Sequence, residues 1–337
     1  MTHSYHQLNW FDTPGPNRVL YPDDPSAVVV SISGGNDSVA TAVWARQRWP
    51  ASRIVLWHAF LTADWPQTDD VINDVAACIG NARRVTLQAV YELDGSTTLG
   101  GFHGTHLKRV QDVDCDGPAV AAPGEILTLL DFARQARKGR PPTAKLRWCT
   151  DYFKRRLCNW WLQENRRQLG PSAVLLSGER HAESTGRSRL PTHAWRCCLQ
   201  PSPGWPHGWR CLWARPLIDL RLHEVTRLVV EAGAPIHPAY FLQGETLAGM
   251  LDPQRDERGR ARLSCVCCIF QPSAAHHYRA HERTGTRATR GGRATSLRAG
   301  NRLLLATAWP TPANTLTATW VCRCPAELKL FGRGICV

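Results

Sequence analysis

The sequence predicts an α/β fold in which helices cover both faces of a doubly wound, mostly parallel sheet of five strands. Three observations predict it: short β-branched apolar runs recur along the chain, helical patterns separate them, and glycine or proline marks the junctions. Strands that alternate with helices pair in parallel through right-handed crossovers, and both faces of such a sheet are buried.

The first half of the chain contains three predicted strands and two helices. Residues 27–33, Ala-Val-Val-Val-Ser-Ile-Ser, form the first strand, and Asp37 to Arg48 forms the first helix. Arg53 to Phe60 is the second buried strand. A helix over Pro66 to Ile79, with proline in its first turn, and a strand over Arg84 to Val90 complete this half.

The second half begins with a predicted long loop. Residues 94–123 are rich in Gly, Thr, His and Asp and show no periodicity, which predicts irregular structure. Helices are expected at about 124–137 and 150–168. The last elements are two strands and a helix that Gly233 and Pro235 end: Ala173 to Leu176, Leu212 to Ile218 and Leu222 to Ala232.

Charge divides the chain into a body and a tail. The chain has 337 residues, and we expect one fold over residues 27–273, a Cys-containing C-terminal extension within it, and an N-terminal extension over residues 1–26. Residues 274–337 carry ten Lys and Arg against two Glu, so +8 of the total charge of +13 lies there. Their composition favours an irregular basic tail, or an altered reading frame, over an arm that binds DNA or tRNA.

The composition also indicates where the protein resides. No run approaches the ~20 apolar residues of a membrane-spanning helix, and Met1-Thr2-His3-Ser4 does not begin a signal peptide. The thirteen cysteines are odd in number and scattered, unlike a secreted disulfide framework. We therefore expect a soluble, cytoplasmic protein with no membrane partner.

The turn between the first strand and the first helix has the composition of a phosphate-binding loop. Glycine carries no Cβ, so the backbone can approach an anion and adopt positive φ. The helix start adds amide donors and its dipole, and two serine hydroxyls can donate. A carboxylate there would repel phosphate unless it binds a cation such as Mg²⁺ or caps the helix. These predicted binding residues are Ser33, Gly34, Gly35, Asn36, Asp37 and Ser38.

Six further motifs follow this loop in order, up to about residue 270. They are Asp64-Trp65-Pro66-Gln67-Thr68, Arg147-Trp148-Cys149-Thr150 with Lys154, Gly178-Glu179-Arg180 with Glu183-Ser184, Arg215-Pro216-Leu217-Ile218-Asp219, His237-Pro238-Ala239-Tyr240 and Ser264-Cys265-Val266-Cys267-Cys268-Ile269. Together with the loop they resemble the phosphoadenosine phosphosulfate (PAPS) reductase family of the adenine nucleotide alpha-hydrolase (ATP pyrophosphatase, PP-loop) superfamily. The resemblance implies a Rossmann-like fold that binds an adenylyl nucleotide.

Two features set the chain apart from reductases of that family. It lacks their C-terminal Glu-Cys-Gly-Leu-His segment, and its intact loop resembles ATP-cleaving relatives such as sulfurtransferase-like enzymes of DNA phosphorothioation and phage PAPS reductase-like proteins. The resemblance thus implies ATP and Mg²⁺ as cofactors, pyrophosphate release, and adenylation of an acceptor for sulfur transfer with a sulfur-donor protein. A thiol-dependent PAPS reductase and a nucleotide-gated nucleic-acid-binding module are the alternatives.

Three basic residues within these motifs are candidates to bind phosphate or sulfate oxygens. A guanidinium matches two anionic oxygens, and a lysine ammonium supplies a point charge. For each one alone, an ordinary solvated charge is the alternative. The resemblance implies nucleotide binding by Arg147 and Arg180, and catalytic roles for Asp37, Lys154 and Arg180.

The cysteines suggest a metal or redox centre. Cys265 and Cys268 form a Cys-x-x-Cys pair around Cys267, and Cys149 lies far upstream. An iron–sulfur cluster normally takes four sulfur ligands, and these four residues would supply them. Adjacent cysteines do not easily point the same way on a strand, so another residue could be the fourth ligand: Cys197, Cys198 or Cys211. The resemblance supports a [4Fe–4S] cluster, with zinc or a thiol cluster as alternatives.

Overall fold

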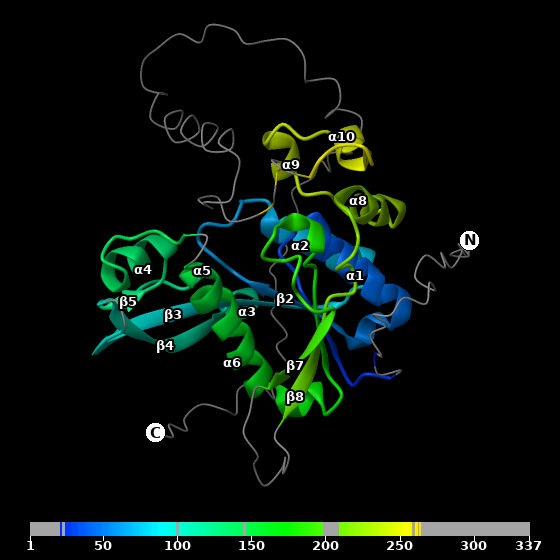
Figure 1. Cartoon of the computed structure of the whole chain (residues 1–337). Coiled ribbons are helices and arrows are strands. Elements are labelled where there is room, and N and C mark those ends of the chain that lie inside the picture. The colour runs from blue at the N-terminus through cyan, green and yellow to red at the C-terminus, as the bar shows by residue number, and fades with distance from the viewer. Residues whose placement is uncertain are drawn as a thin grey trace, which may run out of the picture. The chain divides into compact units, whose positions relative to one another are not determined.

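Eight strands form one mixed sheet in the part of the chain that the structure, a computed structural model, describes (Figure 1). The described residues are 21, 24–98, 101–143, 146–197, 209–257, 260–261 and 263. The strands are β1 Val28–Ser31, β2 Ile54–Ala59, β3 Arg83–Thr97, β4 His103–Asp112, β5 Glu125–Ile126, β6 Val174–Ser177, β7 His193–Cys197 and β8 Arg210–Ala214. Their spatial order is β4-β3-β2-β1-β6-β8-β7, and β5 also pairs with β3.

The centre of the sheet is parallel and doubly wound. β3, β2, β1, β6 and β8 run in one direction, and Val28 of β1 lies opposite both Ile54 of β2 and Val174 of β6. From β1 the chain first builds β2 and β3 on one side and later builds β6 and β8 on the other. The loops that leave β1 and β6 therefore diverge, and such a switch point is where doubly wound sheets bind ligands.

Both edges of the sheet carry antiparallel strands that sequence patterns did not predict. The expected long loop over residues 94–123 is wrong, because β3 continues to Thr97 and β4 pairs antiparallel with it. β4 is a half-exposed edge strand, so it lacks an apolar period, and its charged side chains pair across the strands. Lys108 contacts Glu92 at 2.7 Å, for example. The sheet therefore has eight strands rather than five.

The helices agree more closely with their predicted positions. The longer ones are α1 Asn36–Arg48, α2 Thr68–Cys78, α4 Leu129–Ala136, α6 Leu157–Glu164 and α8 Leu222–Glu231. The shorter ones are α3 Val113–Asp116, α5 Trp148–Thr150, α7 Arg166–Leu169, α9 Ala239–Leu242, α10 Leu247–Leu251, the 3₁₀ turns η1 Ala51–Arg53 and η3 His181–Glu183, and the π-helical turn η2 Asp151–Arg156. The helix expected from residue 124 starts later, because Thr128 caps it by accepting from the Asp131 amide at 3.0 Å.

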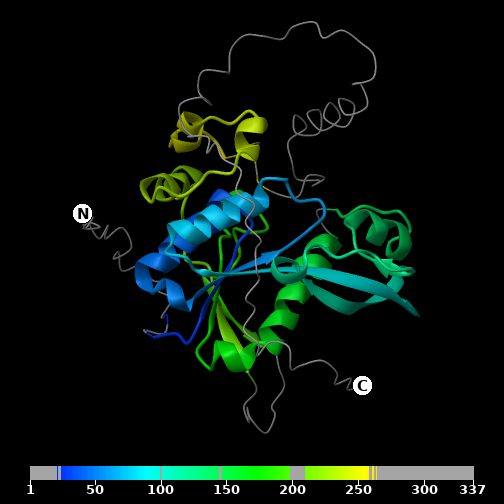
Figure 2. The same cartoon turned by 180° about the vertical axis from the view of Figure 1, so that it is seen from behind.

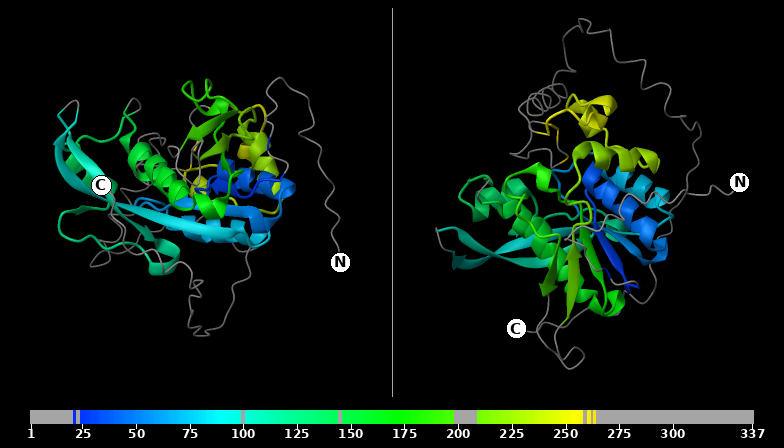
Figure 3. Two further views of the ribbon diagram at one scale, coloured as in Figure 1. Left: turned by 90° about the horizontal axis from the view of Figure 1, so that it is seen from below. Right: turned by 45° about the vertical axis from the view of Figure 1, so that its right-hand side comes forward.

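Two apolar layers enclose the sheet. Val28 and Val30 of β1 face α1, α2 and α8, whereas Val29 between them faces the layer that contains α4, η2 and α6. Tyr91 and Phe132 pack edge to face in the second layer, with ring centroids 5.7 Å apart. Figures 2 and 3 show these helices from behind and from two further directions. The α/β prediction is confirmed in this part of the chain.

Several predicted features fall outside what the structure describes. The proposed tail over residues 274–337 and most of the extension over residues 1–26 lie outside the described residues. Within the described residues, no helix combines the length and the apolar character needed to cross a membrane.

Candidate functional site

A cavity of about 320 Å³ lies where the loops after β1 and β6 diverge. Ser33, Gly35, Asp37 and Ser38 line it from the loop that follows β1. The turn after β6 contributes residues 178–180, the end of α5 contributes Thr150, and η2 contributes Lys154. The segment after α8 closes the remaining wall with Tyr240, Glu257, Arg260, Ala261 and Leu263. The sequence-predicted loop thus forms part of a cavity at the switch point.

The loop after β1 is held in shape by hydrogen bonds to the Ser38 hydroxyl. The Ser33 amide donates to Ser38 Oγ at 3.1 Å, and Ser38 Oγ donates to the Gly35 carbonyl at 2.9 Å. Gly34 has φ of 75°, in the left-handed region that favours glycine. Gly35 precedes α1, and the Ser38 and Val39 amides both donate to its carbonyl at 2.9 Å, so only the first amides of α1 lack an intrahelical acceptor. This geometry is suited to binding an anion at the start of α1.

Two glycines are required here by close packing. A Cβ on Gly178 would lie 2.4 Å from the Asp37 carbonyl oxygen and 2.8 Å from the Ser38 nitrogen. A Cβ on Gly35 would lie 3.2 Å from Leu263 Cβ and 3.3 Å from the Tyr240 hydroxyl. The turn after β6 therefore packs directly on the loop, and Leu263 and Tyr240 lie close to Gly35.

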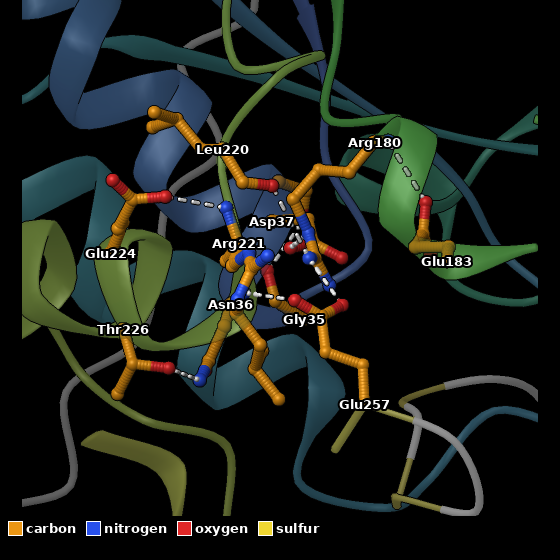
Figure 4. A network of polar contacts seen from close by, with 12 residues as sticks. Gly35, Asn36, Asp37, Arg180, Glu183, Leu220, Arg221, Glu224, Thr226 and Glu257 are labelled. Atoms are coloured by element: carbon orange, nitrogen blue, oxygen red, sulfur yellow. Dashed lines mark hydrogen bonds and ion pairs between the residues drawn. The ribbon is translucent and has the colours of Figure 1, made fainter. Parts of the chain in front are cut away.

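Arg180 joins three segments at the loop end of the cavity (Figure 4). Its Nε donates to Asp37 Oδ1 at 2.6 Å, and its Nη1 donates to Glu257 Oε2 at 2.8 Å. The side chain is only 4% exposed. Burial alone would lower the pKa of Arg180, but the two carboxylates outweigh it and raise that pKa. Arg180 is a fixed cation that bridges two carboxylates across the site.

Asp37 therefore has a protein partner in this structure. Sequence patterns left two roles for its carboxylate, Mg²⁺ binding and helix capping. Gly35 precedes α1 and no side chain caps the helix start, so Asp37 does not cap it. The carboxylate instead accepts a hydrogen bond from Arg180.

The side chain of Asn36 lies away from the cavity. It is fully buried, and its Nδ2 donates to Thr226 Oγ1 of α8 at 3.2 Å, as Figure 4 shows. Its backbone amide donates to the Tyr240 hydroxyl at 3.2 Å. Among the six loop residues predicted to bind nucleotide, Asn36 thus supports the loop through α8 and Tyr240.

The side chain of His237 packs against Gly34 of the loop. Its Nδ1 accepts from the Ala239 amide at 3.1 Å, and its Nε2 lies 3.2 Å from Thr68 Oγ1. An accepting Nδ1 requires the neutral imidazole. Burial lowers the pKa of His237 from 6.5 to about 4, in agreement with that geometry.

Lys154 lines the cavity from a different element, η2. Its side chain is half-buried and makes no hydrogen bond or ion pair with any other described residue. Its neighbours on this wall differ: Arg155 donates to Asp151 at 2.8 Å, and Arg187 pairs with Glu183. A π-helical turn is uncommon and often occurs at functional sites. Lys154 is therefore a cation that the described protein does not neutralise.

The remaining predicted residues are less closely associated with the cavity. Arg147 is exposed at the start of α5 and does not line the cavity in the described structure. Cys149 is half-buried against the apolar core, with Sγ 4.0 Å from Thr150 Oγ1. Cys211, one alternative ligand, is fully buried in that core.

The proposed cysteine cluster falls largely outside the described structure. Four of its candidate ligands are affected: Cys265, Cys267 and Cys268 are not described, nor is Cys198. The side chain of Cys197 is also not described. In the described ranges, no group of three or more His, Cys, Asp or Glu side chains is arranged to hold a metal ion. The iron–sulfur cluster stays a prediction.

Motifs that are distant in the sequence meet around the loop. Arg180 contacts Asp37, and Thr68 contacts His237. Arg215 donates to Glu179 at 2.5 Å. Sequence analysis did not identify Glu257 or give Tyr240 a role. Tyr240 lies in a motif that could have indicated one, whereas Glu257 lies in no motif.

Comparison with known proteins finds likeness only at the level of structure, with low sequence identity in the example given below. Neither a protein-family model nor a curated protein matches the sequence significantly. Among solved structures, the chain is similar to phosphoadenylyl-sulfate (PAPS) reductase from Candida auris in a phosphate complex. The identity is 14% and the TM-score 0.35, over 66% of this chain and 79% of that chain. A likeness at this level assigns neither a family nor an activity.

Proposed function

We propose that the chain is an enzyme that binds ATP in the cavity at the switch point and cleaves it between the α- and β-phosphates. The observation that carries this proposal is one cavity lined by a glycine loop at a helix start, by the buried Arg180 and by the unneutralised Lys154. The loop supplies amide donors, and the two cations face phosphate charge from different walls. The order of the motifs along the chain supports an adenylyl nucleotide as the ligand.

The proposed reaction transfers an adenylyl group to an acceptor. A nucleophilic atom of the acceptor attacks the α-phosphorus, and the bond from that phosphorus to the α,β-bridging oxygen breaks. Pyrophosphate leaves with the bonding electron pair, and the acceptor's proton passes to solvent. Lys154 and Arg180 would stabilise the negative charge that develops on pyrophosphate. Activation of the acceptor in this way would prepare it for sulfur transfer.

The residues present fit a magnesium ion. Asp37 and Glu257 provide hard carboxylate oxygens at the loop end of the cavity, and Mg²⁺ in nucleotide sites takes one or two carboxylates together with phosphates. Asp37 would hold the ion, since both oxygens of Glu257 already accept hydrogen bonds, from Arg180 and from the Leu222 amide. When bound, Mg²⁺ would supply positive charge that offsets the phosphates.

Pyrophosphate release tests this proposal. The full chain, purified without oxygen, is incubated with ATP and Mg²⁺ across candidate acceptors, with the adenylylated acceptor and pyrophosphate as the products measured. We expect the two in equal amounts, and loss of both in Lys154→Gln. A chain that binds no ATP in calorimetry at millimolar concentration would contradict the proposal. Sulfite formation from PAPS with a thiol donor would instead favour the reductase alternative.

A further inference from the structure

A second buried guanidinium, that of Arg260, lines the cavity at the switch point. Arg260 is only 4% exposed, and Arg180 is buried to the same extent. Arg260 follows α10 in the chain, and Leu263, three residues later, lies close to Gly35 just before α1. The segment that carries Arg260 therefore lies beside the loop after β1, at the loop end of the cavity.

Backbone carbonyls hold the Arg260 guanidinium in place. Its Nε donates to the Asp256 carbonyl at 3.1 Å, and its Nη2 donates to the carbonyls of Gly249 at 2.9 Å and Arg255 at 3.5 Å. Its Nη1 makes no hydrogen bond or ion pair with any residue that the structure describes. Two nitrogens thus fix the plane of the guanidinium, and the third keeps its donor hydrogens for a ligand.

The protein does not pair the Arg260 charge with a bonded carboxylate. Three carboxylates lie near it, and each accepts hydrogen bonds from groups other than Arg260: those of Glu245, Asp252 and Glu257. Burial lowers the pKa of Arg260, and the charge of Arg255 lowers it further, more than the three carboxylates raise it. Arg180 is equally buried, but its two bonded carboxylates raise its pKa overall. The two guanidiniums therefore differ in whether the protein neutralises them.

The lining of the cavity as a whole is positive. Six of the charged side chains that line it are cations and four are carboxylates, so their net charge is +2. Three of the cations form ion pairs within the protein, and Arg196 donates to Asn159 at 2.6 Å. Lys154 and Arg260 are the lining cations that bond to no side chain of the described residues. The cavity attracts an anion, and these two cations can contact it.

The surroundings of the cavity differ between its ends. Three apolar side chains line it from the strands β2, β6 and β8: Trp57, Leu175 and Trp213. They lie in or against the apolar layer that contains α4, η2 and α6. Ala261 and Leu263, the neighbours of Arg260, pack in a separate small cluster beside the loop. A nucleoside fits the apolar strand side, and phosphates fit the loop side, where Arg260 lies.

We infer that Arg260 is a phosphate-binding residue that contacts the pyrophosphate part of the nucleotide and not its adenylyl part. The inference rests on the proposed function and adds a cation for the leaving group. Arg260 donates through Nη1 to an oxygen of the β- or γ-phosphate, while the backbone carbonyls keep its guanidinium fixed. A buried cation without a bonded anion is unfavourable, so the pyrophosphate part supplies the charge that Arg260 lacks in the ligand-free protein.

The test compares two arginines of the same segment. Arg260→Met removes the buried cation, and Arg260→Lys keeps a charge but not the fixed fork of donors. Arg255→Met is the matched control, because Arg255 is exposed, pairs with Glu245 at 2.7 Å and does not line the cavity at the switch point. Calorimetry on each full-length chain in Mg²⁺ measures the binding of inorganic pyrophosphate, ATP and AMP.

We expect Arg260→Met to weaken the binding of pyrophosphate and of ATP about tenfold or more, because each loses a charge-assisted hydrogen bond. AMP binding should change less than about twofold, which also reports that the cavity is formed. Arg260→Lys should lose less affinity for pyrophosphate than Arg260→Met. Arg255→Met should bind all three ligands within about twofold of the wild type.

Four results would overturn the inference. Unchanged binding of pyrophosphate and ATP in the Arg260 variants would remove its contact with phosphate. Equal losses for AMP and ATP would show that it does not act on the pyrophosphate part. Loss of AMP binding in both Arg260 variants would assign Arg260 to the fold. Equal losses in Arg255→Met would show that any lost charge in this segment suffices. Failure of the wild type to bind ATP is different, because it contradicts the proposed function.

Discussion

The two walls of the cavity at the switch point are built in opposite ways. On the loop wall, Arg180 is buried and bonded to Asp37 and Glu257, and Gly178 packs directly on the backbone of the loop. On the η2 wall, Lys154 is half-buried and has no partner among the described residues. The loop wall is fixed by interactions within the protein. The η2 wall instead offers the charge of Lys154 to a ligand that binds in the cavity.

This difference separates residues that maintain the site from residues that act on a ligand. Substitution on the loop wall removes interactions of the folded chain, so it should reduce stability and binding together. Substitution of Lys154 removes no interaction of the described protein, so it should reduce binding alone. The predictions below test that separation, from the largest expected effect to the smallest.

Arg180→Met should destabilise the fold by about 3–5 kcal/mol, because it leaves two carboxylates facing each other without their cation. Urea unfolding followed by circular dichroism measures the change. Arg155→Met is the matched control, since its ion pair with Asp151 is exposed and should contribute less than about 1 kcal/mol. Similar losses in the two variants would show that the Arg180 bridge is not a structural centre.

Gly178→Ala should destabilise the fold by about 1–3 kcal/mol and weaken ATP binding, because the added methyl group would overlap the backbone of Asp37. Thermal unfolding and calorimetry give the two values. In Gly186→Ala, the new Cβ meets no atom within 4 Å, so both values should stay at the wild-type level. A neutral Gly178→Ala would contradict the close packing of the β6 turn on α1.

His237 should make stability depend on pH between about 6.5 and 4. The pKa of His237 is lowered to about 4 in the folded chain, so only the unfolded chain binds this proton in that window. Stability should then fall as the pH falls from about 6.5 to 4, by about 3 kcal/mol from this group, because each unit of the pKa difference is worth about 1.4 kcal/mol.

His237→Gln should flatten that slope, as measured by urea unfolding at several pH values. His223→Gln, at a partly exposed position of α8, serves as the control and should leave the slope unchanged. An unaltered slope in His237→Gln would show that His237 does not stay neutral in the folded protein.

Lys154→Gln should weaken ATP binding about fivefold to tenfold, or about 1 kcal/mol, and change stability by less than about 0.5 kcal/mol. Calorimetry and thermal unfolding on the same preparation measure both. A large loss of stability in Lys154→Gln would show that Lys154 stabilises the fold. The η2 wall would then not differ from the loop wall in this respect.

The sequence predicted the centre of the fold better than its edges. β1 and β6 are covered on both faces, so their apolar runs are continuous and easily recognised. β4 is half-exposed and carries charges that pair across strands, so the same criteria predicted a loop. Edge strands are specified by their neighbours, and a single sequence does not show those neighbours.

The site was predicted to a similar extent. Local composition indicated the loop, and the family resemblance singled out Lys154 and Arg180; the structure brings all three to one cavity. Neither identified Glu257, since its partners Arg180 and Leu222 lie 77 and 35 residues away in the sequence. Local composition also assigned ligand binding to Asn36, whose buried side chain contacts α8 through Thr226. Long-range contacts of this kind follow from the fold and not from local composition.

The most direct test of the central claim is a crystal structure of the full chain with Mg²⁺ and α,β-methylene ATP, an analogue that resists cleavage between the α- and β-phosphates. We predict that its phosphates lie at the start of α1, beside residues 34–38, with Lys154 within hydrogen-bond distance of a phosphate oxygen. An analogue bound away from this cavity, or phosphates remote from both the loop and Lys154, would contradict the account.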